Sequence, residues 1–555
     1  MPIIVLIPGV LCIFALLRGR TKAAFLAVFI PVLVLLPTDY FWRAPHLPPI
    51  SFIEATLFPL GIGMLLMDTS RWKLTRTDFW MVLFVFSNIY PQFRDRCRED
   101  LCTTDWALAL FATVTTAVIP YMAGKLVIEQ PGVRKETIRR LSWLLSIISV
   151  LSMPEFFTQV NLFRHFWLKF FPDEWQMLPT ATRNGFGRLG GPYAGAEQAG
   201  IVLLVGLSFA LWLHFLSSPR PEKTVSAARR YRSGFAWLHF LAPRSIQKTV
   251  SARRYWSGFA WLHLLAPPRV EKTVSARRYR SGFAWLHLPA PPRVEKTVVR
   301  RYRSGFALLH FLDSPRVEKA KHAIFSRGKS KVMILLFAVT LFMTQARGPW
   351  IGQIFSLGIA SIGKAKKPGR MAVVVVAIFI FVGIPAYKSF KEYSSGPRKD
   401  FGSEQETAQY RQELLDNYIP VAKEGGAWGW GPRFPVTEGQ DSIDNEYLLV
   451  WLLQGYVGFV AFTLLLLEGI MSLIWLGIKA RLRSDRAFIF SLLGIIIGIG
   501  ITIGTVYLGS QPYELFFLLI GWSQAVRLTT PAQQEQEAAA SNQILTQDTR
   551  IRVYT

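Results

Sequence analysis

Long apolar stretches recur along the whole chain, and short polar segments separate them. A helix needs about 20 apolar residues to cross the hydrocarbon core of a bilayer. Stretches near that length fall at 2–17, 22–37, 50–67, 77–92, 106–128, 141–158, 199–216, 331–346, 349–363, 371–388, 447–477, 487–508 and 513–527. Some of them are short, so the pattern predicts an all-α, polytopic bundle of about 12 to 13 transmembrane helices.

The composition agrees with this fold class. Of the 555 residues, 51 % are hydrophobic and 18 are tryptophan, which is typical of a polytopic membrane protein and excludes an ordinary soluble enzyme. The first apolar run begins at Pro2 with no basic region ahead of it, so we expect no cleavable signal. The three cysteines form no pair or His/Cys cluster with zinc-site spacing, so no structural metal is expected.

Basic residues crowd alternate connections between the apolar stretches, and the positive-inside rule makes those connections cytoplasmic. The opposite connections, which include 159–198 and 389–446, are then outside. The chain divides into N-terminal membrane helices at 1–216, a cytoplasmic insertion at 217–330, membrane helices at 331–388, an outer loop with short helices at 389–446, C-terminal membrane helices at 447–527 and a disordered polar tail at 528–555.

The insertion repeats itself about every 24 residues between 217 and 320. This block holds 21 Lys and Arg against 5 Asp and Glu, so it supplies +16 of the net charge of +27. Each apolar part is about ten residues, roughly 15 Å as a helix, which is too short to span a bilayer. The units instead suit contact with anionic headgroups at the membrane surface. The simplest alternative is recent duplication of a tolerated loop without a specific role, and we expect no nucleic-acid partner.

An arginine stands at the junction of two predicted membrane helices. Arg347 follows the apolar run 331–346 and precedes the run 349–363. A guanidinium in the hydrocarbon core costs roughly 2.5–3.5 kcal/mol on insertion scales, so such residues are rare and commonly functional. Arg347 is therefore either a charged hinge at the interface or a fixed cation for an anionic substrate group.

The predicted outer side carries three more groups of residues, each beside a helix end or a turn. They are the glycine-rich segment Arg188–Tyr193, the outer-loop residues Arg411 and Trp430, and the run Asp444–Leu448 with Asn445 and Tyr447. Arginine offers a bidentate fork for phosphate, and glycine lets the backbone approach a ligand. Each feature also has a structural explanation, such as a turn, a surface charge or a helix cap by Asp444. Together, three arginines and a carboxylate on one membrane face predict an anion site.

These residues resemble the motifs of the O-antigen ligase and O-antigen polymerase superfamily of bacterial inner-membrane proteins. The similar motifs are an Arg-x-Gly-Gly-type segment at Arg188–Tyr193, a Ser-Arg-Gly-like motif at Ala346–Gly348, an Arg ahead of a Gly-x-Gly turn at Arg411 and Gly429–Gly431, and an Asn-x-Tyr-Leu segment at Asn445–Leu448 followed by Gly455 and Gly458. The resemblance covers roughly 100–216 and 331–527. Ligases of the family place a histidine where this chain has Asp444, and none of its eight histidines lies in 389–446.

The resemblance implies a glycosyltransferase at the periplasmic face of the inner membrane, acting in surface polysaccharide biosynthesis. Its donor would be an undecaprenyl-diphosphate-linked glycan, and its acceptor another glycan or a lipid. Arg347 and Arg411, with Arg188 as a substrate contact, would stabilise the leaving diphosphate without a metal or cofactor. Asp444 would act as base or orienting acceptor, and the predicted sugar contacts are Tyr193, Trp430, Asn445 and Tyr447. The departure at Asp444 leaves polymerase more open than ligase.

Two other classes of function fit parts of the sequence. A flippase for lipid-linked glycans should place charges along a path through the membrane or show inverted repeats. The notable charges here lie at one face. A non-catalytic assembly protein would use the 217–320 repeats as a docking loop.

Overall fold

The computed structural model describes residues 2–37, 40–43, 48–96, 105–171, 180–183, 185–217, 315–394, 403–436 and 442–529. Nearly all of the 217–320 repeats, the tail from 530 onward, and two of the three cysteines, Cys97 and Cys102, lie outside these ranges. The chain divides into two compact units, one of Met1–Ser217 with Ile324–Thr555 and the other of Ser218–Ala323. Apart from residues 315–323, the described residues all belong to the first unit.

Helices dominate the N-terminal half. Its elements are η1 (Pro2–Leu6), α1 (Ile7–Ala24), η2 (Phe25–Phe29), α2 (Ile30–Leu35), β1 (Phe41–Trp42), β2 (Ile50–Ser51), α3 (Phe52–Met67), η3 (Thr69–Arg71), α4 (Arg76–Arg96), α5 (Asp105–Thr113), η4 (Val114–Val118), α6 (Ile119–Leu126), α7 (Val133–Thr158), α8 (Leu162–Trp167), β3 (Thr182–Arg183), β4 (Phe186–Gly187) and α9 (Ala196–Ser217). The strands form two antiparallel pairs, β1 with β2 and β3 with β4.

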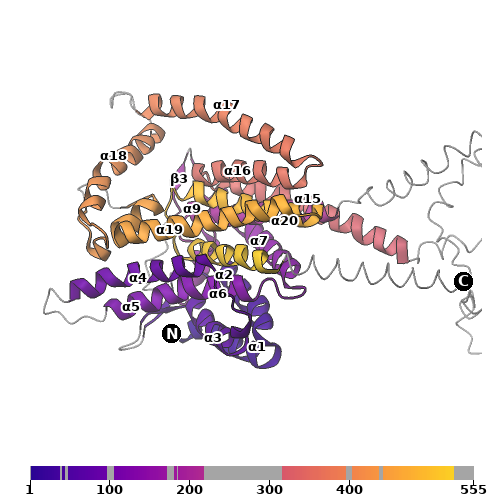
Figure 1. Cartoon of the computed structure of the whole chain (residues 1–555), viewed down its shortest axis with the longest axis horizontal. Coiled ribbons are helices and arrows are strands. Elements are labelled where there is room, and N and C mark those ends of the chain that lie inside the picture. Colours follow the sequence, from indigo (N-terminus) through magenta and orange to yellow (C-terminus); the bar gives the residue numbers. More distant parts are fainter. Residues whose placement is uncertain are drawn as a thin grey trace, which may run out of the picture. The chain divides into compact units, whose positions relative to one another are not determined.

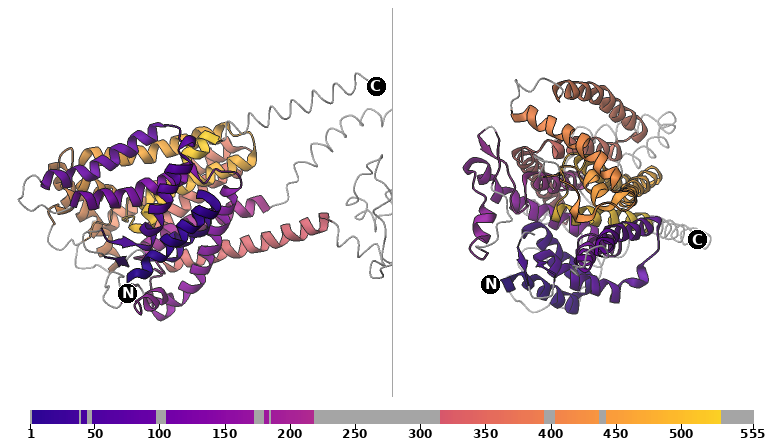
Figure 2. Two further views of the ribbon diagram at one scale, coloured as in Figure 1. Left: turned by 90° about the horizontal axis from the view of Figure 1, so that it is seen from below. Right: turned by 90° about the vertical axis from the view of Figure 1, so that its left-hand side faces the viewer.

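The C-terminal half is also helical. It contains α15 (Pro315–Met343), α16 (Arg347–Lys364), α17 (Pro368–Ser394), α18 (Ser403–Glu424), η7 (Gly431–Arg433), α19 (Glu446–Lys479), α20 (Arg483–Thr502) and a last helix at 510–529. The predicted all-α bundle is confirmed, and the chain is a multi-pass membrane protein. Figures 1 and 2 show most helices side by side in one bundle, with α17 at its edge, on the opposite side from α1 and α3.

Fewer helices reach spanning length than the sequence predicted. Among the described residues, seven helical stretches are long and apolar enough to cross a membrane. They are Ile3–Leu35, Trp106–Leu126, Val133–Thr158, Ala196–Ser217, Pro368–Pro385, Glu446–Lys479 and Arg483–Thr502. Two predicted spans, 2–17 and 22–37, belong to the first of these stretches, which is interrupted at Arg20 (φ 60°, ψ −170°). Several other predicted spans lie in helices that are shorter or less apolar, such as α3 and α16.

The centre of the bundle depends on close contact between α16 and α20. A Cβ atom on Gly352 would lie 2.3 Å from the carbonyl oxygen of Gly498, so neither helix could keep its position with a larger residue there. Small residues at such contacts let membrane helices approach until their backbones touch. This contact fixes the start of α16, and therefore the position of Arg347.

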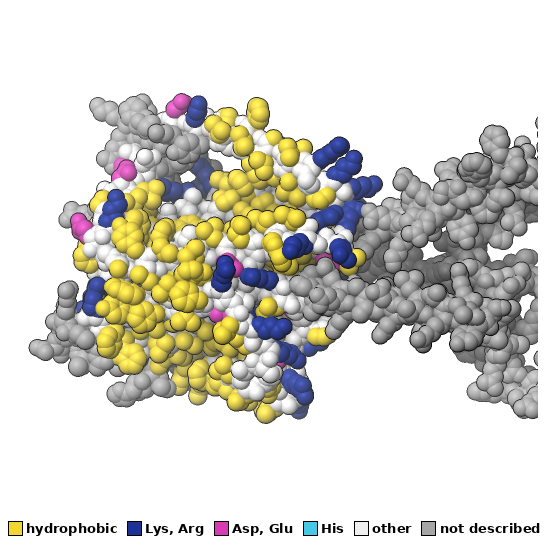
Figure 3. All heavy atoms as spheres, in the orientation of Figure 1, with side chains coloured by type: hydrophobic (Ala, Val, Ile, Leu, Met, Phe, Trp, Pro, Cys, Tyr) yellow, Lys and Arg dark blue, Asp and Glu magenta, His cyan; other side chains and the backbone are white. Residues whose placement is uncertain are grey.

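The surface has an apolar flank and a basic end. Figure 3 shows hydrophobic side chains over the flank of the bundle, while Lys and Arg gather at the end where α17 begins. Only 6 % of the Pro368–Pro385 stretch of α17 is buried against the rest of the protein. A surface of this kind suits contact with lipid chains along the helices and with headgroups at their basic ends.

Candidate functional site

Arg347 is the first residue of α16, directly after a tight turn. Gln345 adopts a positive φ of 51°, and no side chain caps the helix at Ala346. The first N–H groups of a helix lack intrahelical partners and carry partial positive charge. The half-buried Arg347 side chain therefore adds a full charge to an end that already favours anions.

The segment before α9 lies over this same turn. The backbone N–H of Leu189 donates to the carbonyl oxygen of Met343 at 3.2 Å. The Arg183 guanidinium donates to the carbonyl of Gln345 at 2.9 Å, and Arg188 Nε to that of Thr344 at 3.4 Å. These bonds bring the first two predicted features, Arg188 and Arg347, to one place.

Glu155 holds the glycine turn that follows Arg188. Its Oε2 accepts the backbone N–H groups of Gly190 at 3.1 Å and Gly191 at 2.9 Å. Its Oε1 accepts from Asn161 at 2.9 Å and from Thr180 at 3.0 Å. Glu155 was not predicted from the sequence, because it lies at the end of an apolar stretch; the signal that could have found it is an acidic residue inside a predicted span.

Glu197 is the second carboxylate that the sequence analysis missed. It lies in the first turn of α9 and forms an ion pair with Arg188, which also donates it a hydrogen bond. Both side chains keep some contact with the surroundings: Arg188 is 15 % exposed and Glu197 is 30 % exposed. A charged residue in the first turn of a helix is ordinary in sequence, so only the fold reveals this pairing.

Helix α18 carries Arg411 and packs on the beginning of α19. A small apolar core separate from the main one joins the two helices; it is formed by Leu414, Tyr418, Ala422, Ile443, Leu448 and Leu452. The polar outer loop is thus anchored by its own buried side chains. This anchoring determines which way the Arg411 face of α18 points.

The glycine-rich turn after α18 fits into a break in α19. Gly455 has φ 66° and ψ −164°, which interrupts the helix. A Cβ atom on Gly429 would lie 2.4 Å from the nitrogen of Gly455, so the two backbones touch. Trp430 holds the turn in place through two hydrogen bonds of 2.8 Å. Its backbone N–H donates to the carbonyl oxygen of Leu452, and its indole N–H donates to that of Val421. The Gly429–Gly431 turn and Gly455, which belong to separate motifs of the sequence, therefore contact each other in the fold.

Arg411 lies among the charges contributed by these elements. Burial lowers the pKa of its guanidinium, and the positive charges of Arg347 and Arg188 lower it further, while Asp444 and Glu197 raise it. Its Nε atom is buried and has no hydrogen-bond partner among the described residues. We call Arg188, Glu197, Arg347, Arg411 and Asp444 the arginine site. It contains three cations and two carboxylates.

Asp444 lies at the edge of this site. Ser442 Oγ donates to Asp444 Oδ1 at 2.8 Å, and the Tyr410 hydroxyl donates to the backbone carbonyl of Ser442 at 2.7 Å. Burial raises the pKa of Tyr410, and the negative charge of Asp444 adds to that effect. The helix cap expected as the alternative role of Asp444 belongs to its neighbour Asn445, whose side chain accepts the N–H of Leu448 at 3.1 Å.

A cleft of about 290 Å³ adjoins Asp444 through Ser442. Aromatic and aliphatic side chains line most of it; the lining residues are Tyr418, Phe434, Val436, Ser442, Ile443, Leu449 and Tyr507. Apolar walls with a few polar groups at one edge are typical of small-ligand sites. Its aromatic rings and its position beside a carboxylate suit a sugar ring.

The other predicted sugar contacts are held within the protein. The Tyr447 hydroxyl donates to the carbonyl of Gly500 at 2.8 Å, and the Tyr193 hydroxyl donates to that of Val34 at 3.4 Å. Tyr193 is only 2 % exposed. The roles of Tyr193, Trp430, Asn445 and Tyr447 as sugar contacts stay predictions, and each has a structural bond that explains its position.

The arrangement suits a polyanion. The three arginines come from three separate segments of the chain, and the charges of Arg188 and Arg347 act on the guanidinium of Arg411. Together with Glu197 and Asp444 they carry one net positive charge. In the described part of the chain, no group of three or more His, Cys, Asp or Glu residues could hold a metal ion. The positive charge that the described residues supply at this site comes from guanidinium groups and a helix N-terminus.

Comparison with known proteins supports a specific assignment. A family model described as O-antigen ligase matches residues 332–463. This range runs from α15 into α19 and includes Arg347, Arg411 and Asp444, whereas Arg188 and Glu197 lie before it. No curated protein matches the sequence.

Proposed function

Since its match to the O-antigen ligase model supports membership of the O-antigen ligase superfamily, we propose that this chain transfers or polymerises glycans carried on undecaprenyl diphosphate. The reaction takes place at the periplasmic face of the bacterial inner membrane, where the arginine site receives the donor. The acceptor is a hydroxyl of a second glycan or of a lipid-linked sugar.

The gathering of Arg188, Arg347 and Arg411 carries this proposal. Glycosyl transfer from a diphosphate carrier breaks the bond between the anomeric carbon and the diphosphate oxygen, and negative charge grows on that oxygen. Guanidinium groups stay protonated at all physiological pH values and bind phosphate oxygens in pairs. Donors fixed in place before the reaction stabilise such charge without reorganising. The arginines thus supply the charge that a metal ion supplies elsewhere.

Asp444 completes the reaction on the acceptor side. The acceptor hydroxyl forms the new bond to the anomeric carbon, and its proton passes to the Asp444 carboxylate or to water oriented by it. The donor leaves as polyprenyl diphosphate. The cleft beside Ser442 holds the acceptor sugar, whose ring lies against Phe434 and Tyr418. A carboxylate is a weak base toward a sugar hydroxyl, so orientation of the hydroxyl is the larger contribution of Asp444.

The test is the glycan profile of a null strain that carries wild type, Arg347→Ala, Asp444→Ala or the control Arg433→Ala. Arg433 is an exposed arginine of the same outer loop and is not among the charges that act on Arg411. We expect Arg433→Ala to match wild type and both site variants to lose product, with protein levels checked by immunoblot.

The form of the lost product distinguishes the two activities. Loss of long polymer, with single repeat units still on the surface acceptor, identifies a polymerase. An undecorated acceptor with intact lipid-linked polymer identifies a ligase. Unchanged glycans in both site variants contradict the proposed glycosyl transfer and leave transport or assembly as the function.

A further inference from the structure

A second concentration of positive charge lies at the far end of α16 from the arginine site. The helix begins at Arg347 and ends at Lys364, so at 1.5 Å per residue its two ends are about 26 Å apart. This distance is close to the thickness of the hydrocarbon core of a bilayer, about 30 Å. The two ends of α16 therefore lie near opposite surfaces of the membrane.

Two segments of the chain are joined at this far end. Arg483 Nε donates to the carbonyl oxygen of Lys364 at 3.0 Å. The Arg486 guanidinium donates to the carbonyl oxygens of Gly363 at 3.3 Å and Ala365 at 3.1 Å. The joined segments, 364–370 and 479–486, contain eight Lys and Arg residues and a single acidic residue. We call these two segments the basic patch.

The basic patch is less neutralised than other basic connections. Basic residues are common at the ends of membrane helices, so their number alone does not define a site. However, Arg71 pairs with Asp68 after α3, and Arg134 pairs with Glu129 at the start of α7. In the basic patch, seven positive charges remain after Asp485 is counted against one of the eight. Such an excess attracts an anion from outside the protein.

Lys364 is a half-buried cation within the basic patch. Burial lowers the pKa of its ammonium group to about 8, and no carboxylate of the described residues offsets this effect. A buried charge without a partner is costly, and an anion placed beside it would lower that cost. Lys367 and Arg370 are exposed at the start of α17, so they can reach the same anion without a change of fold.

Exposed apolar side chains adjoin these basic residues. Ile478 is 75 % exposed directly before Lys479, whose Nζ lies 3.6 Å from the centre of the Trp475 ring. On α17, Val373 follows Arg370 by about one turn and is 69 % exposed. A soluble anion needs only the charges, whereas a phospholipid places its headgroup on cations and its acyl chains on neighbouring apolar side chains. The combination favours a phospholipid.

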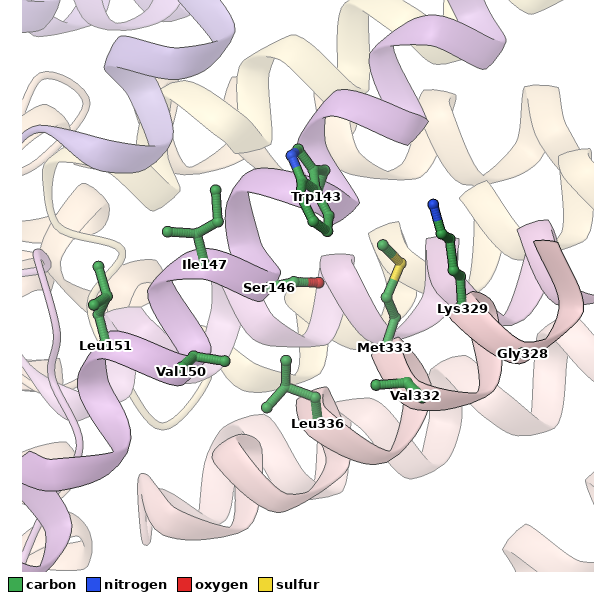
Figure 4. Close-up of a pocket in the computed structure, with 10 residues that line it drawn as sticks. All are labelled: Trp143, Ser146, Ile147, Val150, Leu151, Gly328, Lys329, Val332, Met333 and Leu336. Atoms are coloured by element: carbon green, nitrogen blue, oxygen red, sulfur yellow. The ribbon is translucent and has the colours of Figure 1, made fainter. Parts of the chain in front are cut away.

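The apolar hollow between α7 and α15 shows why both features are needed. This hollow has a volume of about 700 Å³, and Lys329 is the one charged side chain among the ten residues that line it (Figure 4). Exposed apolar side chains of a membrane helix contact hydrocarbon, so such walls alone name no ligand. The basic patch, in contrast, combines apolar contact with a large excess of positive charge.

We propose that the basic patch binds the headgroup of an anionic phospholipid. Its phosphate lies among Lys364, Lys367 and Arg370, and its acyl chains lie against the first turns of α17. This site is separate from the arginine site, and it does not depend on the proposed glycosyl transfer.

Binding of phosphatidylglycerol to the purified full-length protein tests the proposal. The patch variant combines Lys367→Gln with Arg370→Gln. Its matched control combines Lys73→Gln with Arg76→Gln, which removes an exposed Lys and an exposed Arg at the same spacing from the start of α4. Phosphatidylcholine with the same acyl chains is the uncharged reference lipid, and the bound lipid is counted by native mass spectrometry.

We expect the Kd for phosphatidylglycerol to rise about tenfold or more in the patch variant and to change by less than about twofold in the control. Phosphatidylcholine should bind equally to all three proteins. Equal rises in both variants would indicate attraction by the total charge of the protein, and no rise in either would show that the patch is not used. Either result would overturn the assignment.

A soluble competitor distinguishes a lipid site from a general anion site. Glycerol 3-phosphate carries the same kind of phosphate without acyl chains, so it should displace phosphatidylglycerol only at much higher concentration. Displacement at similar concentrations would show that the apolar side chains do not contribute, and would overturn the lipid assignment.

Thermal unfolding gives a second measurement that does not involve counting bound lipid. A ligand that binds the folded protein raises its Tm. Phosphatidylglycerol should therefore raise the Tm of wild type and of the Lys73→Gln, Arg76→Gln control more than that of the patch variant. The same rise in all three proteins would contradict the proposal.

Discussion

Two groups of partly or fully buried charges show opposite arrangements. Near the start of α4, Asp78 and Lys125 form a buried ion pair with an N–O distance of 2.6 Å. Tyr121 donates to the same carboxylate at 2.7 Å, and the ammonium lies 4.6 Å from the centre of the Trp72 ring. In the arginine site, by contrast, three guanidinium groups share two carboxylates, and Arg411 Nε lacks a partner among the described residues.

The difference separates a structural role from a binding role. A buried pair that is balanced one to one satisfies its own charges and needs nothing further. A cluster with excess charge of one sign is costly in the empty protein and becomes favourable when an ion of opposite charge binds. Asp78 and Lys125 therefore join helices, whereas the proposed role of Arg188, Arg347 and Arg411 is to bind an anion.

The largest effect is expected from breaking the balanced pair. Asp78→Asn leaves Lys125 charged and unpaired inside the bundle, which should destabilise the protein by about 3–5 kcal/mol. Thermal unfolding in detergent measures this loss. The double variant Asp78→Asn with Lys125→Met removes both charges and should recover most of it. Equal instability of the single and double variants would show that the pair does not act as one unit.

The next largest effect is expected from the unbalanced cluster, and on activity rather than stability. Arg411→Ala removes one preorganised cation and should slow transfer by about 10²–10³-fold. Its thermal unfolding should stay close to that of wild type, because Arg411 Nε has no hydrogen-bond partner among the described residues and burial opposes the charge of the guanidinium. Arg411→Lys should recover only part of the rate, since an ammonium lacks the paired donors. A large drop in stability with normal activity per folded molecule would show that Arg411 has a structural role and not a binding role.

A smaller effect of opposite sign, a gain in ligand affinity, is expected when the charge of Glu197 is removed. Glu197→Gln raises the net positive charge of the arginine site by one unit and releases Arg188 from its ion pair. Affinity for undecaprenyl diphosphate should rise about tenfold, because a negative charge close to the ligand is removed. Glu424→Gln, an exposed acidic residue at the end of α18, is the control. Weaker binding by Glu197→Gln would show that Glu197 positions Arg188 more than it opposes the anion.

Much of the fold followed from the sequence, since apolar stretches of near-spanning length have few alternatives to membrane helices. The interruptions of the helices at Arg20 and Gly455 could not be predicted from the sequence. A single residue with positive φ leaves the hydrophobic pattern intact, so one apolar run can hold two helical segments. Short runs such as 349–363 were predicted as spans, but α16, which contains this run, is not among the seven described stretches that are long and apolar enough to cross a membrane. Close packing of α16 against α20 explains its burial.

The residues of the candidate site also fall into two groups, those that stand out in the sequence and those that only the fold brings together. Arg188, Arg347 and Arg411 stood out in the sequence because arginine beside glycine turns or apolar runs is unusual, and Asp444 stood out as a carboxylate at a helix start on the same predicted face; their roles stay predictions. Glu155 and Glu197 were missed, since their partners lie in other segments and are brought together only by helix packing. Tyr193 and Tyr447 were chosen as aromatic residues near those motifs, and their hydrogen bonds to Val34 and Gly500 depend on contacts that no local pattern encodes.

The most direct test of the central claim is binding of undecaprenyl diphosphate to the purified protein in nanodiscs. Wild type is compared with Arg347→Ala and with Arg433→Ala, the exposed arginine of the outer loop. The proposal predicts that Arg347→Ala raises Kd at least about tenfold, the loss expected for a charge-assisted contact, and that Arg433→Ala binds as wild type does. Equal affinities for all three proteins would contradict the assignment of the arginine site to a lipid-linked diphosphate.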